Sequence, residues 1–193
     1  MKEKGLLIVV SGPAGCGKST VLKALTEKRE NLRFSISVTT RSPRPGEQNG
    51  REYFFINKEE FERMVQEDQL LEYAHYTDHW YGTPQRQVEE MLENGMDVYL
   101  DIEVQGAGII RRKCPSALFI FLMPPSMEEL ERRLRGRGTE TEVSIQKRLE
   151  RAQGECAVRE RFDYVVVNDT VARAAEEISS LIDKKKAELR AQA

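Results

Sequence analysis

Short apolar runs alternate along the chain with segments whose apolar residues recur every three to four positions. An apolar run without alternation is typical of a strand covered on both faces, as in a parallel sheet. Such runs lie at 5–10, 97–103, 117–122 and 164–167. The intervening segments predict amphipathic helices, because residues such as Val21, Leu22 and Leu25 fall on one helical face. The pattern therefore predicts an α/β fold, with a parallel sheet covered by helices on both faces.

Capping residues set the expected starts of several helices. Three polar residues each precede an acidic residue by three positions, which is the spacing of an N-terminal capping box. These pairs are Asn57 with Glu60, Ser126 with Glu129, and Thr139 with Glu142. They predict helices at 58–68, 126–135 and 139–159. Further helices are expected at 105–112, after 168–170, and from Thr83-Pro84 to Glu93 with the proline in the first turn.

The segment 36–80 differs from the rest because it is polar, rich in aromatic residues and antiparallel-like. Strands are expected within and beside it at 34–40, 53–56, 70–76 and 80–83. Two prolines and a glycine impose an extended loop at 41–47. We interpret 36–96 as a mixed β/α insertion and 134–159 as a helical one. Both belong to a single domain, 1–193, whose core comprises about 1–35, 97–133 and 160–193.

The charge balance and the cysteine content indicate which binding partners and which cellular compartment to expect. Charged residues make up 32% of the chain, but the net charge is only −2. This balance gives no reason to expect binding to nucleic acid or to an anionic membrane. Cys16, Cys114 and Cys156 are widely separated, which favours reduced thiols in the cytoplasm. We expect no signal peptide and no membrane span, and the oligomeric state, monomer or homo-oligomer, stays open.

A glycine-rich loop at 11–20 lies between the first expected strand and the first expected helix. Gly12, Gly17, Lys18 and Ser19 match the P-loop pattern G-x-x-x-x-G-K-[ST]. Glycines let backbone N–H groups converge on one anion, and the helix N-terminus adds its positive dipole end. The lysine suits the β- and γ-phosphates, and the serine hydroxyl suits Mg²⁺. The loop therefore predicts a nucleoside triphosphate site; the alternative is a glycine-rich turn with a surface lysine.

Three further groups carry candidate chemistry, each beside a plainer alternative. Arg41 and Arg44 lie three apart in the proline-stiffened loop, where guanidinium groups suit a phosphate dianion; the alternative is a solvated basic turn. Glu72 lies in an otherwise apolar stretch, and its alternative is an exposed charge on a strand edge. Asp101 and Glu103 end an expected core strand, where ligand sites collect in α/β sheets, or else cap the next helix.

Over nearly its whole length the sequence resembles the guanylate kinases, which are nucleoside monophosphate kinases. The most discriminating part is the T-T-R-x-P-R-x-G-E run at 39–47. Other matching stretches are 12–20, 53–55, 81–83, 101–107, 135–138 and 167–169. The resemblance implies a P-loop core, a GMP-binding region at 36–96 and a mobile lid at 134–159. It also implies transfer of the γ-phosphoryl group of ATP to GMP, and to dGMP, with Mg²⁺, in purine nucleotide metabolism and GMP recycling.

The resemblance also implies site residues. Those for GMP are Ser37, Arg41, Arg44, Tyr53, Glu72, Tyr81, Gly82, Thr83, Asp101 and Glu103. Those for ATP are Gly12, Pro13, Ala14, Gly15, Cys16, Gly17, Lys18, Ser19, Thr20, Arg137 and Asn168, with Ser19 also on Mg²⁺. The catalytic residues implied are Lys18, Arg41, Arg137 and Arg148. For Asn168, capping of the last helix by 168–170 is an alternative. We place Arg132, Arg133 and Arg151 on a solvated helical face.

Two other functions compete with the kinase interpretation. One is a catalytically inactive guanylate-kinase-like domain that binds phosphopeptides; such domains typically have degraded phosphate loops, whereas Lys18 and Ser19 are intact here. The other is a related kinase of ribose bisphosphates, which would not need Glu72 together with Thr83. ADP release with different acceptors distinguishes the three.

Overall fold

The computed structural model describes residues 3–76, 78–136 and 141–192. The chain forms two compact units: the first comprises Met1–Leu7 and Asn31–Ala117, and the second comprises Ile8–Glu30 and Leu118–Ala193. Among the described residues, none of the helices combines the length and apolar character needed to cross a membrane.

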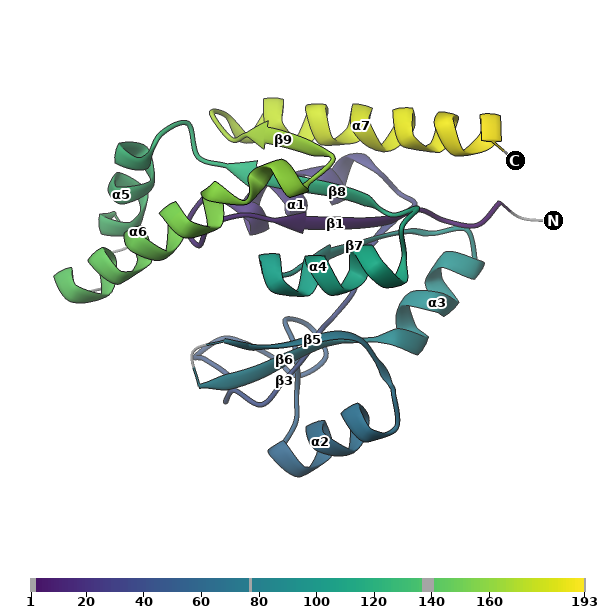
Figure 1. Ribbon diagram of the computed structural model, residues 1–193, viewed down its shortest axis with the longest axis horizontal. Helices are drawn as coiled ribbons and strands as arrows, with labels where there is room; N and C mark the ends of the chain where they lie inside the picture. The colour runs from purple at the N-terminus through teal and green to yellow at the C-terminus, as the bar shows by residue number, and fades with distance from the viewer. Residues whose placement is uncertain (1–2, 77, 137–140, 193) are drawn as a thin grey trace. The chain divides into compact units, whose positions relative to one another are not determined.

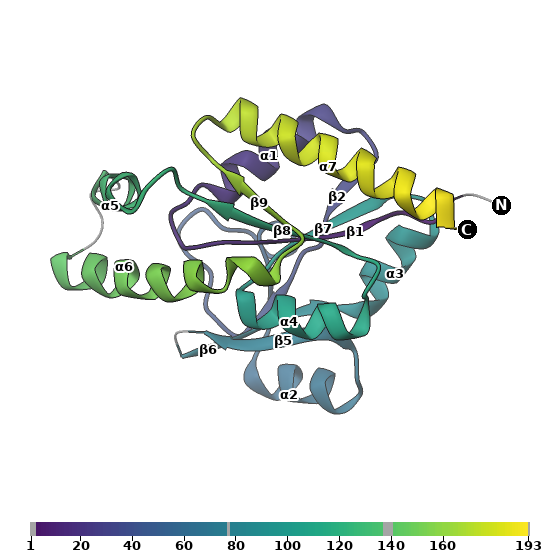
Figure 2. The ribbon, with the colours of Figure 1, turned by 45° about the horizontal axis from the view of Figure 1, so that its top comes forward.

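The second unit contains a parallel sheet with the order β1-β8-β9, seen edge-on in Figure 1. Its strands are β1 (Leu7–Ser11), β8 (Leu118–Met123) and β9 (Tyr164–Val167). Helices α1 (Lys18–Lys28) and α7 (Val171–Gln192) pack side by side, as Figure 2 also shows. The prediction of parallel strands that alternate with helices is confirmed.

The last strand is less buried than its apolar run predicts. Val166 is fully buried, whereas Val165 and Val167 remain 39% and 37% exposed. Successive side chains on a strand point to opposite faces, and α7 packs against β9. One face of β9 is therefore covered while the other stays partly open, so the expectation of a strand buried on both faces is wrong here.

Two helices of the second unit share a small core of their own. They are α5 (Met127–Arg135) and α6 (Glu142–Ala157), and a short 3₁₀ turn follows at Arg159–Arg161. Their buried contacts are made by Leu130, Leu134, Ile145 and Ala152. The predicted cap of α5 is confirmed, since Ser126 Oγ accepts from the Glu129 N–H at 3.1 Å. For α6 the cap is Thr141, whose hydroxyl accepts from the Ser144 N–H; the expected cap, Thr139, lies outside the described residues.

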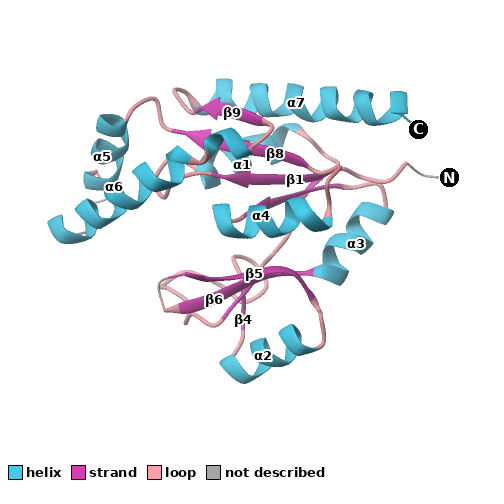
Figure 3. Ribbon diagram, viewed as in Figure 1, coloured by secondary structure: helices cyan, strands magenta, loops and turns pink. Residues whose placement is uncertain are grey.

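The first unit contains a four-stranded sheet with the order β4-β3-β6-β5, shown in magenta in Figure 3. Its strands are β3 (Val38–Thr39), β4 (Phe54–Phe55), β5 (Leu70–Tyr76) and β6 (His79–Pro84). Helix α2 (Lys58–Gln66) inserts Phe61 among Val38, Leu70 and Trp80, and Asn57 caps it as predicted. The pairs β3–β6 and β5–β6 are antiparallel, as expected, whereas β3–β4 is parallel.

The first unit also holds a parallel strand pair and two helices. These are β2 (Leu32–Phe34), β7 (Asp97–Asp101), α3 (Gln85–Glu93) and α4 (Val104–Lys113). The fully buried Asp97 carboxylate accepts from the Leu6 N–H at 2.8 Å and from Asn31 Nδ2 at 3.0 Å. These bonds compensate for removing a charged group from water.

Three predicted boundaries in the first unit are wrong. The strand expected at 34–40 divides, because the Ser35 N–H donates to the Tyr99 carbonyl oxygen in β7, whereas β3 pairs with β4 and β6. Strand β7 ends at Asp101 rather than 103. Pro84 occupies the N-cap position of α3 rather than its first turn, because it is still paired in β6 opposite Leu70.

Candidate functional site

The loop between β1 and α1 has the backbone that its glycines predict. Gly12, Gly15 and Gly17 have φ values of 153°, 94° and 96°, which L side chains rarely adopt. A Cβ on Gly12 would lie 2.1 Å from the Leu122 carbonyl oxygen, and one on Gly15 would lie 2.8 Å from a Leu134 methyl group. The loop is therefore packed against β8 and α5, and glycine is required for both conformation and space.

Polar side chains gather where the loop meets the start of α1. Lys18 Nζ donates to the Gly12 carbonyl oxygen at 2.6 Å, which holds the ammonium group across the loop. Ser19 and Thr20 are exposed in the first turn of α1. Cys16 is fully buried, which fits the expected small side chain. Together with the helix N-terminus, the lysine and the two hydroxyls are the kinds of donor that bind a polyphosphate.

Asn168 contacts this loop. Its side chain is 3% exposed, and its Nδ2 donates to the Cys16 carbonyl oxygen at 2.8 Å. The cap of α7 is supplied by Thr170 instead, whose hydroxyl accepts from the Arg173 N–H. Of the two roles considered for the segment 168–170, the helix cap therefore belongs to Thr170, and the Asn168 amide belongs to the loop.

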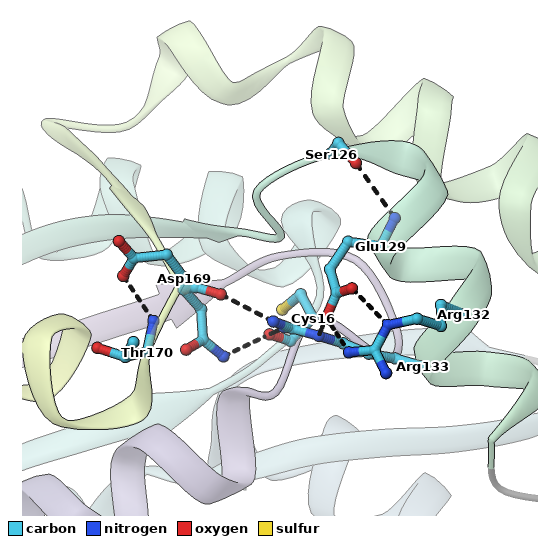
Figure 4. Close-up of polar contacts among 8 residues, drawn as sticks. Cys16, Ser126, Glu129, Arg132, Arg133, Asp169 and Thr170 are labelled. Carbon is cyan, nitrogen blue, oxygen red and sulfur yellow. Dashed lines mark hydrogen bonds and ion pairs between the residues drawn. The ribbon is translucent and has the colours of Figure 1, made fainter.

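The predicted solvated face is wrong for Arg133. Its side chain is only 23% exposed, and it donates from Nη1 to the Cys16 carbonyl oxygen at 3.1 Å (Figure 4). Arg132, by contrast, is 75% exposed and contacts Glu129 on its own helix. Helical periodicity could have placed Arg133 near Leu130 and Leu134 on the buried side of α5, but not at the loop.

The remaining arginines expected on the ATP side belong to α5, α6 and the segment between them. Arg137 lies outside the described residues. Arg135 pairs with Glu131 at 2.7 Å and with Glu142 at the start of α6, which ties the two helices together. Arg148 is half-buried on α6, and Arg151 on the same helix is exposed and pairs with Glu155 at 2.8 Å.

In the first unit, the arginine loop at 41–47 is organised by a carboxylate. Glu47 accepts from Arg41 Nη1 at 2.9 Å and Nη2 at 3.0 Å, and also from the Arg44 N–H at 2.7 Å. These donors, Arg41 first, hold the pKa of Glu47 below its usual value. The Arg41 guanidinium lies over the rings of Tyr53 and Phe55, at 5.4 and 5.6 Å. The Arg44 side chain is exposed.

Arg41 is thus held in place, and the solvated-turn alternative is wrong for it. Its side chain is 12% exposed and that of Glu47 is 17% exposed. The motif at 39–47 ends at Glu47 but does not by itself indicate a role for this carboxylate. A carboxylate six residues from an arginine, in a loop stiffened by two prolines, was the available signal.

Glu72 is buried, so the alternative of an exposed strand-edge charge is wrong. It is 4% exposed and faces Thr83 across the β5–β6 pair, where Thr83 Oγ1 donates to its Oε1 at 2.7 Å. Burial raises the pKa of Glu72 to about 7, against the lowering effects of Thr83 and of the Lys113 charge. A Cβ on Gly106 would lie 2.4 Å from Glu72 Oε2, so α4 leaves room for the carboxylate only because that residue is glycine.

Aromatic hydroxyls gather near Arg41. The Tyr53 and Tyr81 rings are 5.8 Å apart, and burial followed by the charge of Asp101 raises the pKa of Tyr53 to about 12. Ser37 is buried, and its carbonyl oxygen accepts from the N–H of Phe54, which follows Tyr53 in sequence. Tyr53 therefore remains a neutral hydrogen-bond donor near pH 7.

Two further expected residues are Gly82, which lies in β6 of the four-stranded sheet, and Glu103, which follows the end of β7. Gly82 is buried in β6, and a Cβ there would lie 2.8 Å from Leu70 Cδ1. Glu103 occupies the N-cap position of α4, but its side chain does not cap the helix. Glu103 therefore stands at the start of the helix, as the capping alternative expects, but it supplies no side-chain capping hydrogen bond.

Comparison with known proteins gives the family. The family model described as guanylate kinase matches residues 4–185. The chain belongs to the guanylate kinase family. A guanylate kinase of Rubrobacter xylanophilus is 52% identical over 93% of this chain and 94% of its own length. One from Caldanaerobacter subterraneus is 51% identical, over 96% and 90%.

A solved structure agrees at the level of the fold. The crystal structure of guanylate kinase from Anaplasma phagocytophilum superposes with a TM-score of 0.78 and 34% identity, over 96% of this chain and 88% of that one. The α/β architecture is therefore that of the guanylate kinase family.

Proposed function

We propose that this chain transfers the γ-phosphoryl group of ATP to GMP, giving ADP and GDP, with dGMP as a further acceptor. The observation that carries the proposal is the buried Glu72–Thr83 pair, in the same compact unit as the Arg41 loop. The other support is membership of the guanylate kinase family. A carboxylate that selects guanine and an arginine that binds phosphate are the two features that GMP recognition requires.

Glu72 is proposed to select guanine. Its Oε1 accepts from Thr83, and a carboxylate has further lone pairs to accept from the guanine N1–H and 2-amino group. Adenine lacks that donor pair, so AMP would leave a buried acceptor unpaired. Sites that depend on buried polar pairs discriminate by about 10⁴.

The phosphate of GMP is proposed to bind at the arginine loop. Arg41 is already held by Glu47, and Arg44 reaches from the exposed side of the same loop. The hydroxyls of Ser37, Tyr53 and Tyr81 are proposed to donate to the same phosphate, because the raised pKa of Tyr53 keeps its proton in place. Asp101, Glu103 and Gly82 complete the proposed GMP-binding set.

ATP is proposed to bind at residues 12–20 with its phosphates on the loop N–H groups and on Lys18. Asn168, Arg137 and Arg148 are proposed to assist, with Arg148 and Arg137 neutralising charge on the transferred group. Mg²⁺ fits the donor set, because Ser19 offers one exposed hydroxyl oxygen and Mg²⁺ takes its other ligands from phosphates and water. When bound, the ion would neutralise phosphate charge.

No protein base is required in this reaction. The attacking oxygen of the GMP phosphate is already an anion at neutral pH, so catalysis rests on in-line positioning and charge neutralisation. Lys18, Arg41, Arg137 and Arg148 supply the positive charge. Their proposed roles are to bind, orient and neutralise, without moving a proton.

We further propose that 36–96 form the GMP-binding region and that 134–159 form the lid of a single domain in a cytoplasmic enzyme. The separate apolar cluster shared by α5 and α6 supports the lid, and the wide spacing of Cys16, Cys114 and Cys156 along the chain supports a reducing compartment.

A coupled assay of ADP release with GMP, dGMP, AMP or no acceptor tests the function. We expect strong stimulation by GMP and dGMP, and a response to AMP weaker by about 10⁴. Stimulation by a ribose bisphosphate instead of GMP would indicate the other kinase. If ATP and GMP do not react and the protein binds a phosphopeptide, the chain is a binding module instead of a kinase.

A further inference from the structure

A phosphate-binding loop must turn its N–H groups inward, so its carbonyl groups turn outward and need partners of their own. The Cys16 carbonyl oxygen has two such partners: Arg133 Nη1 at 3.1 Å and Asn168 Nδ2 at 2.8 Å. Because the Cys16–Gly17 peptide is trans and planar, its N–H points opposite to its carbonyl group. A group that holds the Cys16 carbonyl oxygen therefore also sets the direction of the Gly17 N–H.

Arg133 is itself held from three sides. Its Nε donates to Glu129 Oε1 at 2.7 Å on α5, and its Nη2 donates to the Asn168 backbone carbonyl oxygen at 3.0 Å. The Glu129 pKa falls to about 2 because Arg132 and Arg133 donate to it. Figure 4 shows the guanidinium between Glu129 and Cys16. One planar group thus connects α5, the phosphate loop and the segment before α7.

The space around Gly17 is shaped by the same contacts. Gly17 has a φ of 96°, and a Cβ there would lie 2.4 Å from Asn168 Nδ2 and 3.9 Å from Arg133 Nη1. A side chain at residue 17 would have to displace the Asn168 amide, whereas Arg133 would stay at ordinary contact distance. Glycine at residue 17 therefore leaves room for the Asn168 donor on the Cys16 carbonyl oxygen.

We propose that Arg133 is a positioning residue for ATP: by holding the Cys16 carbonyl oxygen, it orients the Gly17 N–H toward the triphosphate. This inference rests on the proposed ATP site. It assigns a role in nucleotide binding to α5 itself, through a residue that acts on the loop backbone rather than on the phosphates. Asn168 shares the task from the opposite element.

The test compares Arg133→Ala and Arg133→Lys with Arg132→Ala, the matched control on the same helix. Arg132 shares the partner Glu129 but is mostly exposed. The first measurement is the ¹H–¹⁵N shift of the Gly17 amide in the nucleotide-free protein. We expect the Gly17 amide shift to change in Arg133→Ala, to change less in Arg133→Lys, and to remain the same in Arg132→Ala. An unchanged Gly17 signal in Arg133→Ala overturns the proposal.

The second measurement is the affinity for ATP and for inorganic triphosphate, with GMP affinity as an internal reference. Arg133→Ala removes a charge-assisted hydrogen bond. We therefore expect this variant to bind ATP and inorganic triphosphate about 10- to 100-fold more weakly, and to bind GMP as before. Equal affinities in Arg133→Ala and Arg132→Ala overturn the proposal. If the unsubstituted protein itself fails to bind ATP, the proposed function fails instead. Thermal unfolding of all three variants separates these outcomes from a loss of folding.

Discussion

Glu47 holds the guanidinium of Arg41 with both carboxylate oxygens, at 2.9 and 3.0 Å, and the same carboxylate accepts from the Arg44 N–H. The loop therefore arrives at its ligand with one arginine already oriented. Preorganisation lowers the entropy lost when a phosphate is bound. The carboxylate also places negative charge near the incoming dianion, and this repulsion opposes the gain from orientation.

Replacing Glu47 by Gln is expected to raise the KM for GMP about tenfold, because a neutral amide cannot accept both Arg41 donors. Glu52→Gln is the matched control, since Glu52 pairs with exposed Arg51 in the same region. Steady-state kinetics with ATP saturating measures the effect. A lower KM in Glu47→Gln would mean that repulsion outweighs orientation.

Glu72 predicts a pH dependence of stability. Its pKa is raised to about 7 in the folded protein, from a usual value of 4.5. The folded state therefore binds more protons than the unfolded state between these values, and stability falls as pH rises through that range. The contribution amounts to roughly 3 kcal/mol at most.

Thermal unfolding between pH 5 and pH 8 tests this prediction. The melting temperature of the unsubstituted protein should fall more steeply with pH than that of Glu72→Gln, which has no proton to lose. Glu67→Gln, at an exposed position, should behave like the unsubstituted protein. If the melting temperature fell equally with pH in all three proteins, the raised pKa of Glu72 would be refuted.

Two glycines on α4 provide a matched pair of substitutions. A Cβ on Gly106 would lie 2.4 Å from Glu72 Oε2, whereas a Cβ on Gly108 would meet nothing within 4 Å. Gly106→Ala should displace the carboxylate, weaken GMP binding and cost about 1–3 kcal/mol of stability. Gly108→Ala should leave GMP binding intact and stabilise the helix by up to ~1 kcal/mol. Calorimetric titration with GMP and thermal unfolding measure both effects.

Arg148 is expected to act on the transferred phosphoryl group. Arg148→Ala should lower kcat by about 10³ or more without unfolding the protein, as expected for loss of an arginine that stabilises transition-state charge. Arg151→Ala, on the same helix and exposed beside Glu155, is the control and should retain activity. Single-turnover kinetics measures the rate of phosphoryl transfer in each variant. Equal rates in the two variants would show that Arg148 has no catalytic role.

Local chemistry explains why some predictions were reliable. The P-loop requires glycine at positive φ between a strand and a helix, and the caps at Asn57 and Ser126 use hydrogen bonds to residues three positions away. Each depends on neighbours along the chain. The boundaries that failed, such as the break between β2 and β3 or the position of Pro84, depend on which distant strand pairs with the segment.

The sequence alone determined the α/β pattern, the anion loop and the candidate residues around Arg41 and Glu72, because motif spacing and apolar periodicity are local properties. Only the tertiary structure decided that Glu47 grips Arg41, that Gly106 makes room for Glu72, and that Arg133 reaches the Cys16 carbonyl oxygen across 117 positions. Burial and hydrogen bonding between distant residues appear only once the chain has folded. The protonation, orientation and reach of these side chains therefore could not be derived from residue order.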